Sequence, residues 1–193
     1  MKVYWDVGGT DTSPGSTYDT SSDSPNLRFK TDDNINIDTN NPLPVPASGT
    51  TYSYWKQVYL FCSTAPTTKI DNVKLYSDGS NGFGTDVDLW VGTAFPTKNS
   101  GSDAGYEVAT GIVNVSGDPM WYGGSAHSGI SNVADIFGYT SGSPLSVSIS
   151  EASNQIDAEN ETTNYVVLQM SVGSNASAGA LNAETLTWQY DEI

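Results

Sequence analysis

Four oxygen-bearing side chains surround one predicted hairpin turn, where they could bind a calcium ion. Asp78 and Asn81 belong to the turn at residues 77–82, and Asp86 and Asp88 open the strand that follows. Calcium takes several carboxylate and amide oxygens as ligands. The spacing differs from that of an EF-hand, because the glycine and the terminal glutamate are out of register. Asp and Asn also favour turns by bonding their own backbone, so a structural calcium site and ordinary turn chemistry both stay open.

Asp86 and Asp88 are also candidates for the two catalytic carboxylates of a glycosidase. Two carboxylates on one face of a strand reach a separation of about 5–10 Å, which suits glycoside hydrolysis inside a cleft. However, Trp90 shares this face, and an Asp-x-Asp pair facing solvent is ordinary in an acidic protein. A glycoside-active enzyme is therefore the third of three functional hypotheses.

Three aromatic residues are candidates for a binding surface. Trp90 lies on the strand face opposite Val87, while Trp121 and Tyr122 fall in a turn-rich segment. Such rings offer flat platforms for sugars, and aromatic residues are also enriched at protein–protein interfaces. Trp90, Trp121 and Tyr122 therefore point to a glycan-binding site or to an assembly interface.

The single histidine and the single cysteine do not form a catalytic motif. His127 lies in a glycine-flanked loop, where we expect an ordinary exposed residue. Nucleophilic catalysis would also need a partner carboxylate and an oxyanion hole, which spacing cannot show. Cys62 has apolar neighbours and is predicted to be a buried, unreactive thiol. We therefore expect a protein that is not an enzyme and that needs no cofactor beyond the possible calcium.

The sequence pattern predicts β-strands and little helix. No stretch of 12 residues places apolar side chains at helical spacing without Gly, Pro or β-branched interruptions, whereas alternation with a period of two recurs. Residues 106–115 are expected to form part of a pair of strands. Residues 130–139 are expected to form either a short helix or a bent strand. The clearer strands are expected at residues 2–6, 27–30, 52–62, 71–76, 86–91, 145–149, 166–172 and 184–190.

These elements predict an all-β fold. Eight to ten strands at intervals of about 8–12 residues are typical of a sandwich or barrel. We expect a single antiparallel β-sandwich over residues 1–193, with Greek-key or jelly-roll-like connections. Residues 8–25 are expected to form a loop or an N-terminal arm. The segment 52–62 is apolar on both faces towards its end, which indicates a strand covered on both sides.

Charge narrows the range of partners. The 193 residues include 22 acidic and 7 basic side chains, giving a formal net charge of −15. Such a chain repels the phosphate backbone, so nucleic-acid binding is not expected. No run of about 20 apolar residues predicts a membrane span.

The N-terminus and the composition suggest different compartments. Asp6, Gly8 and Gly9 interrupt the apolar stretch that a secretory signal requires. We therefore expect synthesis in the host cytoplasm without a signal peptide, although the richness in Ser, Thr, Asn and Gly is typical of extracellular proteins. Proteins of virus particles assemble inside a cell and act outside it, so both observations favour a virion location.

The C-terminal third carries a resemblance. Residues 164–170, 173–179 and 184–193 form a strand–turn–strand ending, and residues 70–79 contain a strand and an Asp-Gly turn. These segments resemble virion structural proteins of tailed bacteriophages and archaeal viruses, in particular the last two strands of their immunoglobulin-like and jelly-roll domains. The resemblance implies a structural role and carries over no catalytic residue.

Charge, composition and resemblance lead to one expectation and one alternative. We expect a non-enzymatic structural protein of a virus particle, either an outer capsid decoration or cement subunit or a tail-associated subunit. Its partners would be further copies of itself and other virion proteins. The alternative is a carbohydrate-binding module or adhesin-type domain that binds a glycan through the three aromatic residues.

Overall fold

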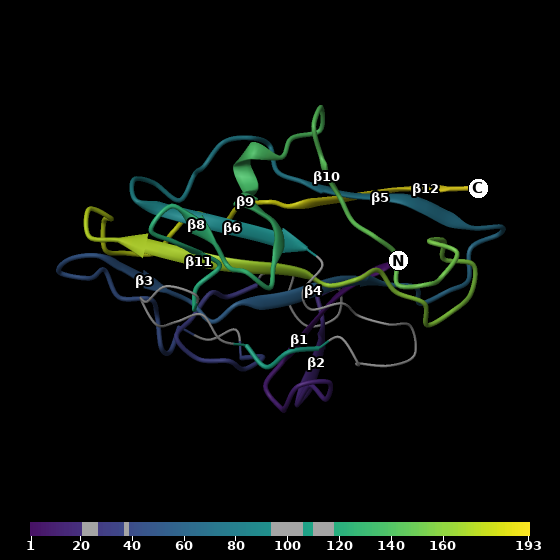
Figure 1. Ribbon diagram of the computed structural model, residues 1–193, viewed down its shortest axis with the longest axis horizontal. Helices are drawn as coiled ribbons and strands as arrows, with labels where there is room; N and C mark the ends of the chain where they lie inside the picture. Colours follow the sequence, from purple (N-terminus) through teal and green to yellow (C-terminus); the bar gives the residue numbers. More distant parts are fainter. Residues whose placement is uncertain (21–26, 37–38, 94–105, 110–117) are drawn as a thin grey trace.

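The strands of the described residues form two packed antiparallel sheets and one short hairpin (Figure 1). The computed structural model describes residues 1–20, 27–36, 39–93, 106–109 and 118–193. The large sheet has the order β2 (Ser16–Asp19), β1 (Lys2–Val7), β4 (Lys56–Phe61), β11 (Val166–Gly173), β6 (Val87–Thr93) and β9 (Ser131–Asp135), and β3 (Thr50–Tyr52) also pairs with β11.

The second sheet is smaller and packs over the large one. It consists of β10 (Leu145–Ser146), β5 (Ile70–Tyr76) and β12 (Thr187–Glu192), which lie above the large sheet in Figure 1. The separate hairpin is formed by β7 (Trp121–Tyr122) and β8 (Ser125–Ala126). The chain passes between the two sheets at each step from β4 to β5, from β5 to β6, from β9 to β10, from β10 to β11 and from β11 to β12, which is the connectivity of a sandwich.

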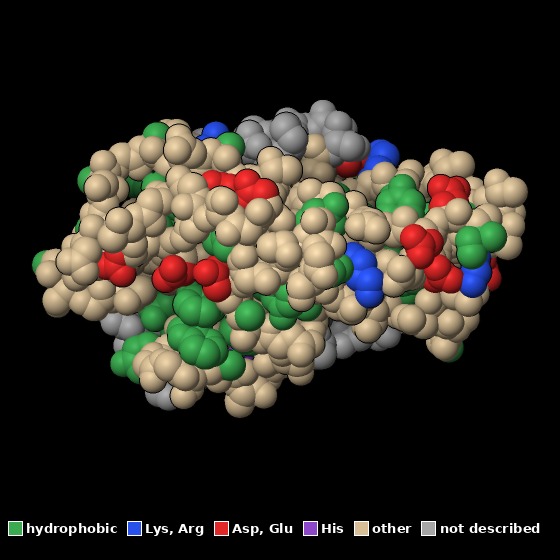
Figure 2. All heavy atoms as spheres, turned by 90° about the horizontal axis from the view of Figure 1, so that it is seen from above, with side chains coloured by type: hydrophobic (Ala, Val, Ile, Leu, Met, Phe, Trp, Pro, Cys, Tyr) green, Lys and Arg blue, Asp and Glu red, His purple; other side chains and the backbone are tan. Residues whose placement is uncertain are grey.

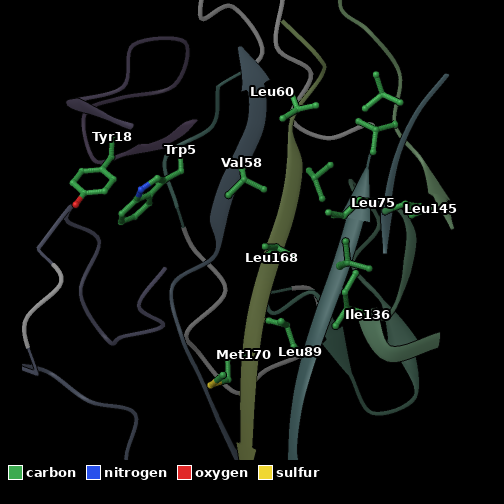
Figure 3. Packing of buried hydrophobic residues seen from close by; sticks show 14 of the residues in the cluster. Trp5, Tyr18, Val58, Leu60, Leu75, Leu89, Ile136, Leu145, Leu168 and Met170 are labelled. Atoms are coloured by element: carbon green, nitrogen blue, oxygen red, sulfur yellow. The ribbon is translucent and has the colours of Figure 1, made fainter. Parts of the chain in front are cut away.

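Alternation of apolar side chains builds the interior of this sandwich. In β6, the residues Val87, Leu89 and Val91 are buried, and they are opposite Val172, Met170 and Leu168 of β11 in the strand register. Figure 3 shows the cluster from close by, with Trp5 and Tyr18 at one end and Leu75, Leu145 and Ile136 at the other. The period-two pattern therefore directs one face of each sheet into a common core.

The predicted all-β antiparallel sandwich is confirmed. Within the described ranges, eight strands have four or more residues, and β3, β7, β8 and β10 are shorter. The helix content there is the three-residue 3₁₀ turn η1 (Ile136–Gly138), whose start is capped by the carboxylate of Asp135. No helix among the described residues is long and apolar enough to cross a membrane.

Several predicted boundaries were wrong. Residues 27–30 form no strand, because Lys30 makes only an isolated bridge to Pro42. The predicted strand at 52–62 is interrupted between β3 and β4, where Ser53 turns its backbone and hydroxyl to the backbone of Met170. The strand expected at 145–149 is regular only over β10, and Ile149 contributes a single bridge to Thr163.

Three other segments match their predicted structure only in part or not at all. Residues 130–139 contain both a strand, β9, and the turn η1, so the two readings of this segment each describe part of it. Residues 106–109 form no strand, and 110–115 lie outside the described residues. Within the expected loop or arm at 8–25, β2 pairs with β1 and Tyr18 enters the core, while residues 21–25 lie outside the described residues.

The outer face of the large sheet is covered as well. Tyr59 of β4 packs there with Tyr106 and Tyr165 in one buried cluster. A second cluster joins Val167 of β11 to Trp55, Ala109, Met120 and Ile130. The expectation that the segment 52–62 is covered on both sides towards its end is therefore confirmed for β4, and the covering segments also shape the candidate site.

Candidate functional site

The outward face of β6 presents one aromatic and one acidic side chain to a shallow pocket. Asp88 and Trp90 alternate with the buried residues of β6 and remain partly exposed, as the sequence pattern predicted. The indole Nε1 of Trp90 donates a hydrogen bond to Ser171 Oγ on β11, at 2.9 Å. This bond fixes the ring across two hydrogen-bonded strands.

Trp121 reaches the same place from the β7–β8 hairpin. Its ring stacks on Trp90, with a centroid separation of 5.0 Å and an interplanar angle of 9°. The hairpin turn consists of Gly123 and Gly124, whose φ values of 57° and 84° lie in the left-handed region that favours glycine. The two glycines thus allow the tight turn that returns β8 alongside Trp121.

Asp86 closes another side of the pocket from the turn before β6. Its carboxylate accepts a hydrogen bond of 2.8 Å from the backbone N–H of Asn175, and its carbonyl accepts one from Gly173. A Cβ atom at Gly173 would collide with this carboxylate, so the close approach requires glycine there. Asp86 itself has φ of 62°, a conformation that Asp tolerates better than most residues.

Together these elements line a pocket of about 240 Å³ that is open to solvent. Figure 2 shows one face of the molecule on which acidic side chains lie beside a cluster of hydrophobic ones. Among the described residues that line the pocket, none is a lysine or an arginine. The lining residues are Thr50, Tyr52, Asp86, Asp88, Trp90, Trp121, Gly123, Gly124, Ser171 and Gly173.

The pocket is electrostatically negative. Burial raises the pKa of Asp88, the neighbouring charges of Asp135 and Asp86 raise it further, and a hydrogen bond with Ser171 opposes the shift. Burial likewise raises the pKa of the Tyr52 hydroxyl, with a smaller contribution from nearby Tyr122. The arrangement therefore favours a partner that brings hydroxyl donors or a positive charge.

The structure brings together two sets of residues that the sequence analysis treated separately. Trp90 and Trp121 line the same pocket as Asp86 and Asp88, although about thirty positions separate the tryptophans. Tyr122 does not line the pocket but lies close enough to Tyr52 to influence its ionisation.

Asp78 and Asn81 do not join this group. Asp78 Oδ1 accepts a hydrogen bond from the Ser80 N–H, while Asn81 accepts one from Phe83 and donates one to the Val87 carbonyl. These are the turn contacts that Asp and Asn favour. Over the described ranges, no three His, Cys, Asp or Glu side chains are grouped so that they could hold a metal ion.

The lone histidine and cysteine both have structural surroundings. His127 is partly buried rather than fully exposed, its Nδ1 accepts a hydrogen bond from Gly129, and its ring packs edge-on against Trp55. Cys62 is buried, as predicted, and its Sγ donates to the Thr64 carbonyl. Burial raises the pKa of this thiol, which disfavours the reactive thiolate.

Asp6 and Lys56 are among the buried polar residues that were not predicted from the sequence. Asp6 accepts hydrogen bonds from Tyr165 and Thr17 on the outer face of the large sheet. Lys56 lies on the core face of β4, with its ammonium nitrogen 4.8 Å from the centre of the Trp5 ring. The sequence contained one indication of this burial. Lys56 and the apolar Val58 are two positions apart in the strand, so their side chains point to the same face.

Comparison with known proteins gave no match: no family model, no curated protein and no solved structure corresponds to this chain.

Proposed function

We propose that the protein is a non-enzymatic structural subunit of a virus particle. In this proposal it serves as an outer capsid decoration or cement subunit, or as a tail-associated subunit, and it acts through assembly with its own copies and with other virion proteins. The single observation that carries the proposal is the stacked pair Trp90 and Trp121 on the face of the large sheet.

The pair has the properties of an interface anchor. Tryptophan is prominent among residues that dominate binding energy, especially where neighbouring contacts fix the ring and exclude water. The Ser171 hydrogen bond holds Trp90, and the glycine turn of the β7–β8 hairpin positions Trp121 before any partner arrives. Less conformational entropy is then lost on association.

Charge indicates the chemistry of the partner surface. The carboxylates of Asp86 and Asp88 flank the rings, and the whole chain carries a net charge of −15. A partner loop with Arg or Lys would satisfy both features, because a guanidinium can stack on indole and pair with a carboxylate. An acidic subunit is also suited to positions that do not contact the packaged genome.

Light scattering of the purified protein, with and without calcium, tests the proposal. We expect a defined oligomer or a growing polymer, weakened about thirtyfold by Trp121→Ala, which corresponds to about 2 kcal/mol for an interface tryptophan. Leu181→Ala is the matched control, since it removes an exposed apolar side chain outside the pocket. A strictly monomeric protein that also binds no capsid or tail component contradicts the proposal.

A carbohydrate-binding module or adhesin-type domain is the second candidate. The observation that favours it is the convergence of indole rings, a tyrosine and two carboxylates on one pocket. Indole faces pack against the apolar faces of sugar rings, while carboxylates accept hydrogen bonds from sugar hydroxyls. Gly123 and Gly124 carry no side chain and meet no neighbouring atom within 4 Å, which leaves room for a ring to approach.

A glycan array distinguishes this candidate from the first. Binding of defined oligosaccharides that is lost in Trp121→Ala and weakened in Asp88→Asn, with Leu181→Ala unchanged, would support it. Silence on the array, combined with oligomerisation that depends on Trp121, would leave only the assembly role.

A further inference from the structure

Lys56 and Asp33 form the most deeply buried ion pair of the described residues. The side chain of Lys56 is fully buried and that of Asp33 is 11% exposed, with Nζ and Oδ1 separated by 3.9 Å. Neither Nζ nor Oδ1 has a hydrogen-bond partner. A buried ammonium group without a hydrogen bond, facing a carboxylate oxygen that also has none, is costly in the charged form, which favours a different chemical state for this pair.

Two other ion pairs between described residues differ in this respect. Lys2 with Asp19 and Lys69 with Asp71 each approach to 2.7 Å, and all four side chains contact solvent. Water and close contact stabilise their charges. Lys56 instead lies against the face of Trp5, at the edge of the main core.

Both members of the pair are shifted towards their neutral forms. Burial lowers the pKa of Lys56 to about 8, and the charge of Asp33 only partly opposes this. Burial also raises the pKa of Asp33, against the hydrogen bond from Gly8 and the charge of Lys56. Both shifts lower the cost of moving one proton from Nζ to Oδ1, a transfer that gives a neutral amine facing a carboxylic acid, the reactive combination for amide formation.

We propose that Lys56 and Asp33 join through an intramolecular amide bond. The geometry of the carboxyl group supports the assignment, because its two oxygens have different surroundings. Asp33 Oδ2 accepts a hydrogen bond of 2.8 Å from the Gly8 N–H, whereas Oδ1 faces Nζ without a partner. The Gly8 donor is placed to stabilise the negative charge that develops on Oδ2 during attack.

The reaction is a condensation that needs no further reactant. The lone pair of Nζ attacks Cγ of Asp33, forming the Nζ–Cγ bond. Oδ1, which carries the proton first received from Nζ, takes a second proton from the amine and leaves as water when the Cγ–Oδ1 bond breaks. No atom is oxidised or reduced, and the product is lighter by one water.

The bond would fasten a long connection to the large sheet. Asp33 lies in the irregular segment between β2 and β3, and Lys56 opens β4. An amide at this point closes a covalent ring around that connection, which limits the freedom of the unfolded chain in the same way as a disulfide. The inference does not depend on the proposed function.

Peptide mass mapping of the native protein tests the bond. Trypsin cannot cleave after an amidated lysine, so we expect residues 31–69 as one fragment that is one water lighter than its sequence. Chymotryptic cleavage within the ring, for example after Tyr52, should then leave two chains joined through Lys56 and Asp33. Ordinary cleavage after Lys56, giving fragments 31–56 and 57–69, would overturn the proposal.

Variants localise the loss of water. Lys56→Met also removes the tryptic site, so its fragment 31–69 provides a matched control that should retain its full mass. Lys69→Met should retain the bond between Lys56 and Asp33, because it alters only a solvated pair. Loss of water that persists in the Lys56→Met fragment would assign the reaction to other residues and overturn the proposal.

Discussion

The indole of Trp90 and the hydroxyl of Ser171 are joined across two neighbouring strands. The bond from Nε1 to Oγ measures 2.9 Å, and Ser171 lies directly opposite Asp88 in the register of β6 and β11. One small side chain therefore contacts both the aromatic and the acidic part of the pocket. Ser171 therefore links the aromatic part of the pocket to its acidic part.

Replacing this serine should loosen the pocket with limited damage to the fold. We expect Ser171→Ala to lower the free energy of unfolding by about 1 kcal/mol, the typical net contribution of a hydrogen bond. Urea denaturation measures this loss, and Ser146→Ala provides the control, because it removes an exposed hydroxyl of β10 that bonds only the solvated Lys74 among the described side chains. If Ser171→Ala weakens oligomer formation or glycan binding as much as Trp121→Ala does, the orientation of the Trp90 ring is essential for binding.

Asp88 should make the stability depend on pH. Its folded pKa is raised above the ordinary value of 3.8, so between these values the folded state binds more protons than the unfolded state. The contribution to stability is therefore present below pH 3.8 and is lost as the pH rises through the folded pKa.

Asp88→Asn should consequently be more stable than the wild type at pH 7. We expect a gain below about 1 kcal/mol, because solvent screens a partly exposed charge. The difference should shrink as the pH falls towards 3.8, which thermal unfolding at several pH values can follow. Asp78→Asn, in an exposed turn, provides the control. If the wild type and Asp88→Asn are equally stable at pH 7, the neighbouring acids do not act on Asp88.

The buried carboxylate of Asp6 provides a matched pair of hydroxyl deletions. Tyr165 donates to this charged group, whereas Tyr106 donates to the neutral carbonyl of Gly8 at 2.8 Å. We expect Tyr165→Phe to cost about 1.5–3 kcal/mol and Tyr106→Phe about 0.5–1.5 kcal/mol. Chemical denaturation of both variants measures the difference, and a larger loss in Tyr106→Phe would contradict this ranking.

Gly92 tests the covering of the outer sheet face. A Cβ atom there would lie 2.2 Å from Ile130 Cγ2 and 3.3 Å from Met120 Cε. We expect Gly92→Ala to destabilise the fold by about 1–3 kcal/mol through overpacking. Gly138→Ala, which meets no atom within 4 Å, is the control, and adding Ile130→Ala should recover part of the loss.

The strands were predictable where one face alone is buried. Val87 and Leu89 alternate with polar or partly exposed neighbours, so local sequence suffices to define β6 and its inward face. The segment at 27–30 shows the opposite case. Its short apolar alternation suggested a strand, but only Lys30 found a bridging partner. Pairing depends on distant segments, which a local pattern does not contain.

The candidate site was predictable in its parts and not in its assembly. Trp90 and Trp121 were identified by their exposure and their aromatic character, and Asp88 by its strand position. Their convergence depends on Ser171 and Gly173, which belong to β11 and have no distinctive pattern of their own. Lys56 was missed because a lysine in a strand is ordinarily exposed, whereas here it lies over Trp5 and pairs with Asp33 from the distant segment before β3.

The central place of β11 has a consequence for the order of folding. This strand separates β4 from β6 in the sheet, and the hydrogen bond from Thr51 to the Val172 carbonyl spans 121 positions. The two halves of the large sheet therefore stay apart until β11 has left the ribosome. Such high contact order slows folding and leaves unpaired edges exposed during synthesis, so nascent chains that stall before residue 166 should be vulnerable to proteolysis and aggregation.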